Sequence, residues 1–426
     1  MTTLILGSGI FGASTALHLI RKHPSHRITL IDRDHYAAPT RVAASWDWNK
    51  VVRSDYSDPF YTRLGLEAQQ LWRSDPIWRE FYHESGVVWV SPSDFAKKVV
   101  KNFEEVGEQV DLSVVGVDEA RKIYGGLFDG ADYTGVKEVL VNRGSGWAEA
   151  KEALQGTIQE AVNLGVSYVT GEVEAVNFED DGRRCTGVMM KDGTVMEAER
   201  VVLCTGACTP KLLVDSAPER REFHADGRIM AVAVTEGTAP LNEEQRAVLE
   251  TMPVGINENP TERGLDVGCL PLPKMGALKC WGQVLFRNTV DHPLTQQPLS
   301  TPPAGPNYNQ WDVPSELKED VRWALRSLFH EGRFDTEMEN FRICWDAVTP
   351  SNDFIVSPHP ASDGLYVATC GSFHGFKFLP VIGKYVVEML DGELDPATAK
   401  RWAWDRQLPP TENNKKWSQR ELKDFA

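Results

Sequence analysis

The N-terminus carries the feature that most constrains how this chain folds. Residues 3–6 (TLIL) form a short apolar run, and the glycine pattern GxGxxG follows directly at residues 7–12 (GSGIFG). A second apolar run covers residues 27–31 (RITLI). Between them, apolar residues recur at the spacing of one helix face, at Ile10, Ala13, Ala16, Leu17 and Ile20. The order strand, glycine turn, helix and strand predicts a βαβ unit of the kind that binds a dinucleotide.

Each glycine of this pattern has a separate steric task. Gly7 allows the tight turn, Gly9 lets a pyrophosphate approach the backbone, and Gly12 lets the helix pack closely on the strand. The helix N-terminus offers free N–H groups and the positive end of a dipole to the phosphates. Asp32 ends the second strand, where its carboxylate can accept hydrogen bonds from ribose hydroxyls and repel a 2′-phosphate. The unit therefore favours FAD or NAD over NADP.

Composition argues against several classes of protein. The chain has 426 residues, more than one compact core usually holds, and its formal net charge of −16 disfavours binding to nucleic acid. No apolar run is long enough for a membrane span, and the seven cysteines contain no CxxC pair, so we expect neither a membrane anchor nor a metal site. A strand at the N-terminus leaves no room for a signal peptide, and residues 423–426 match no peroxisomal signal. We expect a cytoplasmic protein.

Further elements are predicted along the chain. Residues 225–290 alternate apolar runs with Pro and Gly turns and indicate a β-rich layer, and the proline-rich residues 291–313 indicate a long ordered loop. Apolar patterns predict helices over residues 62–84, 147–164, 315–330 and 381–390, and strands from residue 86 and over residues 167–170, 172–177, 200–204 and 364–369.

Pieces typical of nucleotide binding recur far apart, at residues 1–35, 165–208 and 364–390. A domain assembled from separate segments implies a second domain inserted between them. We therefore predict an α/β fold with a Rossmann-type FAD-binding domain (GR2-like) and an inserted α+β substrate domain built on an antiparallel sheet. The predicted bounds are 1–85, 145–215 and 341–400 for the first domain, 86–144 and 216–340 for the second, and 401–426 for a C-terminal tail packed on the surface.

Two features favour FAD over NAD as the dinucleotide. The chain carries no second glycine fingerprint for a separate nicotinamide nucleotide. The late strand 200–204 ends in Thr205-Gly206-Ala207, a pattern that flavoprotein families use to close over the cofactor.

Four blocks of sequence together resemble the amine-oxidising flavoproteins of the D-amino-acid oxidase superfamily. Within it, the chain is most similar to the branch of monomeric sarcosine oxidase, fructosyl amino acid oxidase (amadoriase) and saccharopine or pipecolate oxidase. The blocks are GSGIFGASTALHL at the start, GSGWAEAKEAL at 144–154, FRICWDAVTPSNDFIVSPHP at 341–360 and GSFHGFKFLPVIGKYVVEML at 371–390. The resemblance implies FAD as the cofactor.

The resemblance also implies how the flavin end is held and used. A cysteine ahead of the last Rossmann strand is bonded through sulfur to the flavin 8-methyl carbon in this family, and the matching residue is Cys344. A lysine over the ring is assigned to oxygen activation, because a fixed positive charge stabilises superoxide and peroxide; the matching residue is Lys279. The full set of cofactor contacts that we expect is Gly7, Gly9, Ile10, Phe11, Gly12, Asp32, Arg33, Lys50, Val173, Thr205, Gly206, Cys344, Gly371, Gly375, Phe376 and Lys377.

The substrate anchor implied by the family is a pair of cations that clamp a carboxylate. Lys377, in Gly375-Phe376-Lys377, and Arg53 match that pair, and Lys50 matches a basic residue near the flavin. His374 lies in the same glycine turn as a substrate contact or a packing residue. The chain departs from the amadoriase pattern, which has an acidic residue where this chain has Gln283 and Ser where it has Arg53.

These residues predict oxidation of the C–N bond of a secondary amine, an N-methyl or N-alkyl amino acid, to an imine, with O₂ reduced to hydrogen peroxide. The partners are the small-molecule amine and O₂, and we expect a monomer. Three alternatives stay open: a fructosyl amino acid or saccharopine oxidase, a biosynthetic oxidase whose imine closes a ring, and a flavoprotein dehydrogenase or electron-transfer partner.

Overall fold

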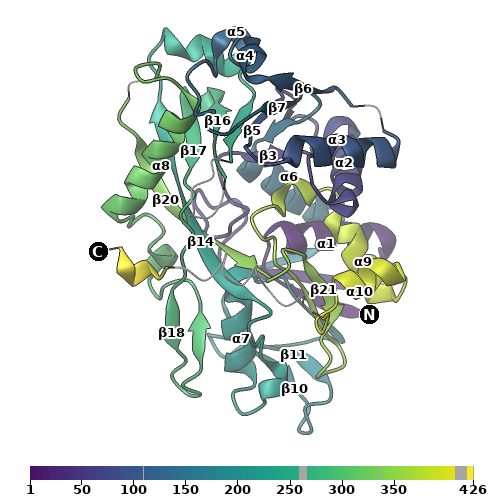
Figure 1. Ribbon diagram of the computed structural model, residues 1–426. Helices are drawn as coiled ribbons and strands as arrows, with labels where there is room; N and C mark the ends of the chain where they lie inside the picture. The colour runs from purple at the N-terminus through teal and green to yellow at the C-terminus, as the bar shows by residue number, and fades with distance from the viewer. Residues whose placement is uncertain (109, 259–265, 335, 408–419, 426) are drawn as a thin grey trace.

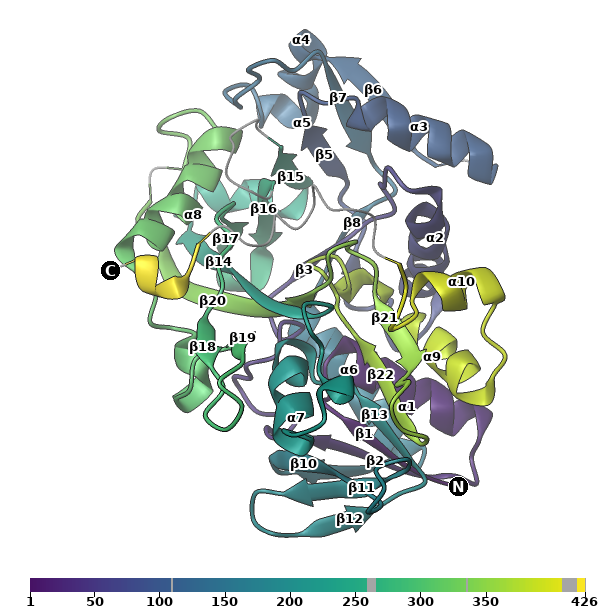
Figure 2. The ribbon, with the colours of Figure 1, turned by 60° about the horizontal axis from the view of Figure 1, so that its bottom comes forward.

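A six-stranded sheet organises the half of the molecule that contains the N-terminus (Figure 2). The structure is a computed structural model that describes residues 1–108, 110–258, 266–334, 336–407 and 420–425. The β1–β2, β1–β13, β2–β9 and β13–β22 pairs are parallel, and β21 alone joins antiparallel, to β22. In spatial order the strands are β21 (Ile355–Pro358), β22 (Leu365–Thr369), β13 (Arg200–Leu203), β1 (Thr2–Leu6), β2 (Arg27–Asp32) and β9 (Ser167–Thr170).

Both faces of this sheet are covered, which explains why its central strands read as continuous apolar runs. Ile5 and Val202 pack against α1 (Ile10–Lys22), α6 (Ala150–Asn163) and α9 (Ile382–Asp391). Leu4 and Val201 point the other way, toward α7 (Thr209–Ser216) and a three-stranded sheet. The strands of that small sheet are β10 (Val173–Phe178), β11 (Cys185–Met190) and β12 (Val195–Glu197).

An eight-stranded sheet forms the other half of the molecule, and its long strand β14 crosses the centre of Figure 1. Its strands pair antiparallel except β15 with β5. One face packs against α8 (Ser315–Leu328), as the helix pattern of that segment predicts. In spatial order the strands are β20 (Glu339–Val348), β14 (Met230–Pro240), β17 (Ala277–Trp281), β16 (Val267–Leu272), β15 (Val254–Asn257), β5 (Val87–Val90), β7 (Glu138–Asn142) and β6 (Leu112–Gly116).

Shorter elements complete the described chain. A three-stranded sheet joins β3 (Lys50–Val52), β8 (Gly146–Ala148) and β4 (Tyr82–His83), and a hairpin joins β18 (Thr289–Asp291) to β19 (Pro298–Ser300). The remaining α-helices are α2 (Pro59–Ser74), α3 (Phe95–Val106), α4 (Val117–Ala120), α5 (Ile123–Gly126) and α10 (Pro396–Arg401). The 3₁₀ turns are η1 (Gly206–Cys208), η2 (Arg221–Phe223), η3 (Gln245–Glu250), η4 (Pro273–Met275), η5 (Pro306–Asn309), η6 (Phe376–Phe378) and η8 (Leu422–Asp424).

Three of the predicted elements need correction. The helix predicted over 62–84 ends at Ser74, because Asp75 precedes Pro76 and takes an extended conformation that the proline ring favours. The helix predicted from residue 147 begins at Ala150, because Trp147 belongs to β8 and pairs with Val51 of β3. The loop predicted over 291–313 contains β19, which pairs with β18.

The tail is described only in part. Residues 420–425 lie against the hairpin region: the Glu421 carboxylate accepts a hydrogen bond from Arg287 at 2.8 Å, and the Phe425 ring packs edge-on against Phe286. Residues 408–419 and 426, which the predicted tail includes, lie outside the described residues. Among those that are described, no helix is long and apolar enough to cross a bilayer. The mixed α/β fold class is confirmed, and the proposed domain bounds stay a prediction.

Candidate cofactor cavity and active site

A cavity of about 900 Å³ lies at the carboxyl ends of β1, β2, β13 and β22, and β14 and β20 also line it. Carboxyl ends of parallel strands are where open α/β sheets bind their ligands. Most of the expected cofactor contacts line it: Gly7, Gly9, Ile10, Phe11, Asp32, Arg33, Lys50, Val173, Thr205, Gly206, Cys344, Gly371, Gly375 and Phe376. Gly12 and Lys377, the other two, do not line it.

The glycine turn has the shape that the sequence pattern predicts. Gly7 adopts a φ of +92°, which favours glycine, and its N–H donates to the Ile31 carbonyl at 2.7 Å. A methyl group at Gly12 would collide with the Gly7 carbonyl oxygen, so only glycine lets helix and strand approach this closely. At Gly9, by contrast, the nearest obstacle to a methyl group is the Ser45 hydroxyl at 3.2 Å. The space beside Gly9 faces the cavity.

Asp32 lines the cavity, and Ser8, Arg41 and the Asp34 N–H hold its carboxylate. Its carboxylate accepts hydrogen bonds from the Ser8 N–H at 2.7 Å and from Arg41 at 2.9 Å. Arg41 is 1% exposed, and its Nε and Nη1 have no partner among the described residues. Arg41 does not line the cavity, so its role is to hold Asp32; the Asp32 carboxylate, the space beside Gly9 and the N-terminus of α1 suit a ligand with ribose and phosphate oxygens. The residues present therefore fit the ADP half of a dinucleotide.

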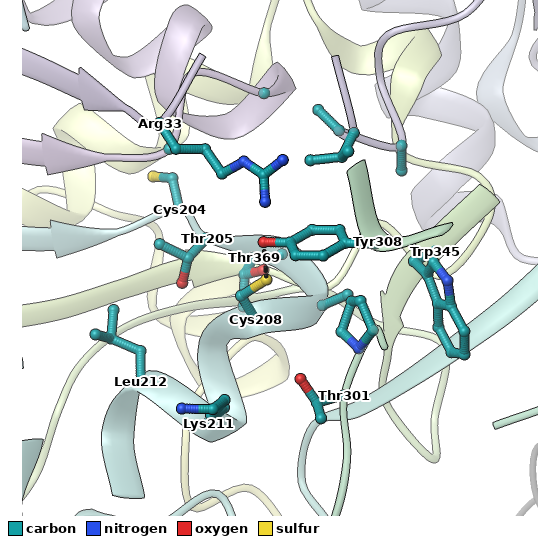
Figure 3. A pocket seen from close by; sticks show the side chains of 18 of the residues that line it. Arg33, Cys204, Thr205, Cys208, Lys211, Leu212, Thr301, Tyr308, Trp345 and Thr369 are labelled. Atoms are coloured by element: carbon teal, nitrogen blue, oxygen red, sulfur yellow. Dashed lines mark hydrogen bonds between the residues drawn. The ribbon is translucent and has the colours of Figure 1, made fainter. Parts of the chain in front are cut away.

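Tyr308 lines the cavity, although no sequence pattern predicted it there. Figure 3 shows Tyr308 between Arg33 and Cys208, with the Arg33 guanidinium 4.4 Å from the ring centroid. The Tyr308 hydroxyl lies 3.2 Å from the Cys208 sulfur. Residues 301–305 of the same segment also line the cavity. The proline and glycine content of this segment signalled an ordered loop, but no pattern placed the loop over the cofactor site.

At the other end of the cavity, five charged side chains from four segments meet. Asp47 and Glu236 are the acids, and Lys50, Lys279 and Arg342 are the bases. The Lys50 ammonium lies 2.6 Å from the Asp47 carboxylate, and the Glu236 carboxylate lies 3.0 Å from Lys279 and 2.9 Å from Arg342. Three cations face two carboxylates, so this charged cluster has one excess positive charge when all five are ionised.

Burial makes the pairing in the charged cluster strong. Burial by itself would raise the pKa of Asp47, but the charges of Lys279, Lys50 and Arg342 outweigh it and hold that pKa well below its usual range. Burial would also lower the pKa of Lys50, and the neighbouring acids, Asp47 first, raise it instead. Both groups are therefore ionised at neutral pH.

Lys279 and Lys50 differ in what they face. Lys279 is 2% exposed, and its ammonium is fully engaged by Asp47, Glu236 and the Asn49 carbonyl. It does not line the cavity, whereas Lys50 does. Lys50 is thus the member of the charged cluster that presents its charge to the cofactor cavity.

Cys344 lines the cavity next to the charged cluster. It lies on β20 opposite Val234 of β14 and is 2% exposed. Burial raises the pKa of its thiol, while the nearby Lys50 and Arg342 charges act in the opposite direction.

Arg53 and Lys377, the predicted carboxylate clamp, come close together outside the cavity. Both lie over the Tyr56 ring, with Arg53 at 4.6 Å and Lys377 at 5.5 Å from its centroid. Arg53 also lies 4.8 Å from the Trp89 ring centroid. The Lys377 ammonium donates to the His374 carbonyl at 2.8 Å. Burial, aided by the charge of Arg53, holds the pKa of Lys377 well below its usual range.

His374 packs in an aromatic cluster. Its Nε2 lies 2.9 Å from the Asn352 carbonyl and its Nδ1 3.2 Å from the Tyr56 hydroxyl. The ring stacks on Phe354 with centroids 5.1 Å apart. These contacts are those of a packing residue. His374 also adjoins the clamp, because its Nδ1 contacts Tyr56, over which Arg53 and Lys377 lie.

No group of three or more His, Cys, Asp or Glu side chains within the described ranges is arranged to hold a metal ion.

Comparison with known proteins places the chain in a family. It is 27% identical to L-saccharopine oxidase of Schizosaccharomyces pombe over 419 residues, covering 95% of this chain and 93% of the other. It is 28% identical to the amino acid oxidase imqH of Aspergillus flavus, covering 91% and 92%. The fold is similar to that of a modified fructosyl peptide oxidase from Aspergillus nidulans, with a TM-score of 0.84, 24% identity and coverage of 100% and 98%.

The family match covers most of the chain. Residues 2–389 match DAO, the family described as FAD dependent oxidoreductase. This match confirms the superfamily, the enzyme class and the cofactor FAD that the sequence predicts. The chain is therefore a member of the FAD dependent oxidoreductase (DAO) family.

Proposed function

We propose that this protein oxidises the C–N bond of a secondary amine, an N-substituted amino acid, to an imine, with O₂ as the second substrate and hydrogen peroxide as the second product. The observation that carries the proposal is the pair Arg53 and Lys377 beside a cavity whose charged end has one excess positive charge. Two converging cations suit a carboxylate. The relatives named L-saccharopine oxidase and amino acid oxidase support an amino acid substrate.

The cavity residues divide between the two halves of FAD. Gly9, the N-terminus of α1 and Asp32 would hold the ADP half, with Arg41 behind Asp32, and Cys344 and Lys50 would adjoin the flavin. When bound, FAD accepts a hydride equivalent from the substrate and passes two electrons to O₂. We propose that Cys344 would hold the flavin through a thioether, because it lines the cavity next to Lys50, whose charge favours the thiolate. Forming the bond would release the thiol proton and one proton of the flavin methyl group, and O₂ would accept the two electrons.

The remaining residues act by electrostatics and position. Only a neutral amine can release hydride, and the positive charge of Lys50 disfavours a second cation at the reacting nitrogen. A substrate carboxylate between Arg53 and Lys377 would fix the α-carbon relative to the ring. The oxidised substrate is an imine, which water hydrolyses to a carbonyl compound and an amine.

Acid denaturation of the purified protein tests the covalent link. We expect the precipitate of the wild-type protein to stay yellow and that of Cys344→Ser to become colourless while FAD remains in the supernatant. Cys370→Ser is the matched control, because Cys370 is also fully buried but does not line the cavity. A colourless wild-type precipitate, or a yellow one from Cys344→Ser, would reject the thioether at this residue.

The reaction is tested by substrate turnover and product analysis. An oxygen electrode with sarcosine, N-methyl amino acids, pipecolate, saccharopine and fructosyl amino acids should show oxygen uptake with one hydrogen peroxide formed per substrate oxidised. A peroxide yield near zero with substrate consumed would instead indicate a dehydrogenase or an electron-transfer protein. A cyclised amine in mass spectrometry, in place of a carbonyl compound, would indicate the biosynthetic alternative.

A further inference from the structure

The two faces of β17 have different surroundings. Leu278 and Cys280 belong to the apolar core that contains α8 residues such as Val321. Side chains alternate between the faces of a strand, so Lys279 and Trp281 lie on the opposite face, which carries the charged cluster. Trp281 is thus the next side chain after Lys279 on the face that bears the catalytic charges.

The indole of Trp281 is held flat against the sheet. A methyl group at Gly268, its partner on β16, would collide with the indole atoms Cη2 and Cζ2. The indole Nε1–H donates to the Asp266 carbonyl at 2.9 Å. Trp281 is half-buried and packs against the apolar cluster that contains Trp89. The missing side chain at Gly268 and the hydrogen bond to Asp266 therefore fix the ring in one orientation.

Strand register places this ring between the carboxylate clamp and the charged cluster. On one side Trp281 pairs directly with Glu236 of β14. On the other side the row continues through Gly268 and Ile256 to Trp89, over which Arg53 lies. Figure 2 shows these strands in succession from β14 through β17, β16 and β15 to β5. With strands ~4.8 Å apart, the row from Trp281 to Trp89 spans roughly 14 Å.

Trp281 is the accessible member of this row, because it is half-buried, whereas Ile256 and Trp89 are 2% and 5% exposed and lie in the apolar core. Gly268 carries no side chain, so the indole lies over its backbone. A polyol or a second carboxylate over the Trp281 indole would lose its hydration without gaining a partner, whereas an aromatic group would gain apolar and ring contacts. The Arg53 guanidinium beside Trp89 already accounts for one carboxylate.

We propose that Trp281 is a specificity-determining residue whose indole, laid flat over Gly268, forms a platform for the side chain of the substrate, so that the enzyme prefers N-substituted amino acids with an aromatic side chain. This inference rests on the proposed function and extends it from N-substituted amino acids in general to aromatic ones. Small substrates such as sarcosine leave the platform uncovered, and fructosyl amines and saccharopine place polar groups over it.

The test compares substrates that share the reacting group and differ only in the side chain. The FAD-loaded enzyme is assayed by peroxide formation with N-methyl-L-phenylalanine, N-methyl-L-tryptophan, N-methyl-L-alanine and sarcosine. We expect kcat/KM for the two aromatic substrates to exceed that for N-methyl-L-alanine at least about 10-fold, the range that apolar pockets achieve. Equal values for phenylalanine and alanine derivatives would overturn the inference with the proposed function intact. Peroxide only with saccharopine, pipecolate or fructosyl amino acids would also overturn the inference, whereas absence of peroxide with all of these amines would reject the proposed function.

Three variants test whether the indole causes the preference. Trp281→Ala should reduce the aromatic-to-alanine ratio of kcat/KM at least about 10-fold, and Trp281→Phe should retain most of it. Gly268→Ala should reduce the ratio in the same direction although the indole is still present, because the new methyl group displaces the ring; that methyl also meets the Gly255 carbonyl oxygen at 2.6 Å, so the thermal unfolding of this variant is measured alongside. Gly116→Ala is the matched control: Gly116 lies on β6 of the same sheet, and a methyl group there has no neighbour within 4 Å.

The dissociation constants of two unreactive ligands distinguish a loss of specificity from damage to the charged cluster. The dissociation constant of phenylacetate, an unreactive aromatic carboxylate, is measured from its perturbation of the flavin absorption spectrum, with acetate for comparison. Trp281→Ala and Gly268→Ala should weaken phenylacetate and leave acetate unchanged. If Trp281→Ala does not fold, Trp281→Leu, which keeps an apolar side chain without the flat ring, takes its place. An unchanged ratio in the folded Trp281→Ala or Trp281→Leu variant would overturn the assignment to Trp281.

Discussion

The two ends of the cofactor cavity are built in different ways. At one end, residues 7–12 and Asp32 come from a single βαβ unit, and the contacts are those of backbone and glycine. At the other end, the charged cluster joins acids and bases from β3 and the turn before it, from β14, from β17 and from β20. The first end depends on the absence of side chains, and the second depends on a balance of buried charges.

This difference determines what each end tolerates. A glycine turn such as residues 7–12 loses stability or cofactor affinity when atoms are added, because a backbone group or the cofactor already occupies the space. A buried ionic cluster fails when one charge is removed, because its partners remain buried without compensation. The two ends should therefore respond to opposite kinds of substitution.

The largest effect is expected at Glu236 in the charged cluster. Glu236→Gln leaves Arg342 and Lys279 without this carboxylate, and breaking a buried pair in this way costs about 3–5 kcal/mol. The free energy of unfolding, measured by urea denaturation, should fall by that amount. The double variant Glu236→Gln/Arg342→Met, which also removes one cation, should recover part of the loss. A loss below about 1 kcal/mol in the single variant would show that the charges of the cluster are not coupled.

The next largest effect is expected at Gly9, and it differs in kind from the effect at Gly12. Gly9→Ala has room in the protein itself but places a methyl group where a pyrophosphate would lie, so stability should be retained and FAD affinity should fall about 10- to 100-fold. Gly12→Ala puts a methyl group into the Gly7 carbonyl and should destabilise the fold itself. Thermal unfolding of the apoproteins and FAD titration, both in the Cys344→Ser background where binding is reversible, distinguish the two. Equal FAD affinity with and without Gly9→Ala in that background would place the phosphates elsewhere.

The same contrast explains what could be predicted from the sequence. Gly7, Gly9 and Gly12 act within one local pattern, so their geometry followed from spacing alone. Glu236 sits in a strand that otherwise reads as apolar, and only the register of β14 against β20 and β17 brings it to Arg342 and Lys279.

Long-range packing accounts for the other residues that the sequence did not reveal. Tyr308 lines the cavity and Arg41 contacts the cavity residue Asp32, and both come from loops whose sequences carry no cofactor pattern. Lys279 was expected over the flavin, and its strand position is as expected. Its engagement by two buried acids depends on Asp47, which comes from a segment more than 200 residues away.

A smaller effect is expected at Lys377, whose protonation state should change when a ligand carboxylate binds beside it. The pKa of Lys377 is lowered in the free site by burial and by Arg53, and a carboxylate beside it should raise that pKa again. Between the two values, binding must take up a proton. Affinity for phenylacetate should therefore fall as pH rises, by up to about tenfold per pH unit.

Calorimetric titration in buffers of different ionisation enthalpy measures this proton uptake. Wild type should take up as much as one proton per phenylacetate bound, and Lys377→Met should take up none. Lys377→Arg is the matched control, because a guanidinium stays charged and should bind without proton uptake. Uptake that persists in Lys377→Met would assign the proton to another group.

The smallest effect is expected at Tyr308, which belongs neither to the glycine turn nor to the charged cluster. Its ring lies beside Arg33 at the rim and should cover the adenosine part of FAD, so Tyr308→Ala removes one aromatic contact worth about 1 kcal/mol, or roughly fivefold in affinity. The measurement is FAD titration in the Cys344→Ser background, where binding is reversible. Tyr308→Phe keeps the ring and loses the hydroxyl contacts with Cys208 and Arg33, so its affinity should match that of Cys344→Ser alone if the ring provides the contact. If the phenylalanine variant binds as weakly as the alanine variant, the hydroxyl and not the ring holds this side of the cavity closed, and this side would then depend, like the charged cluster, on a specific polar contact.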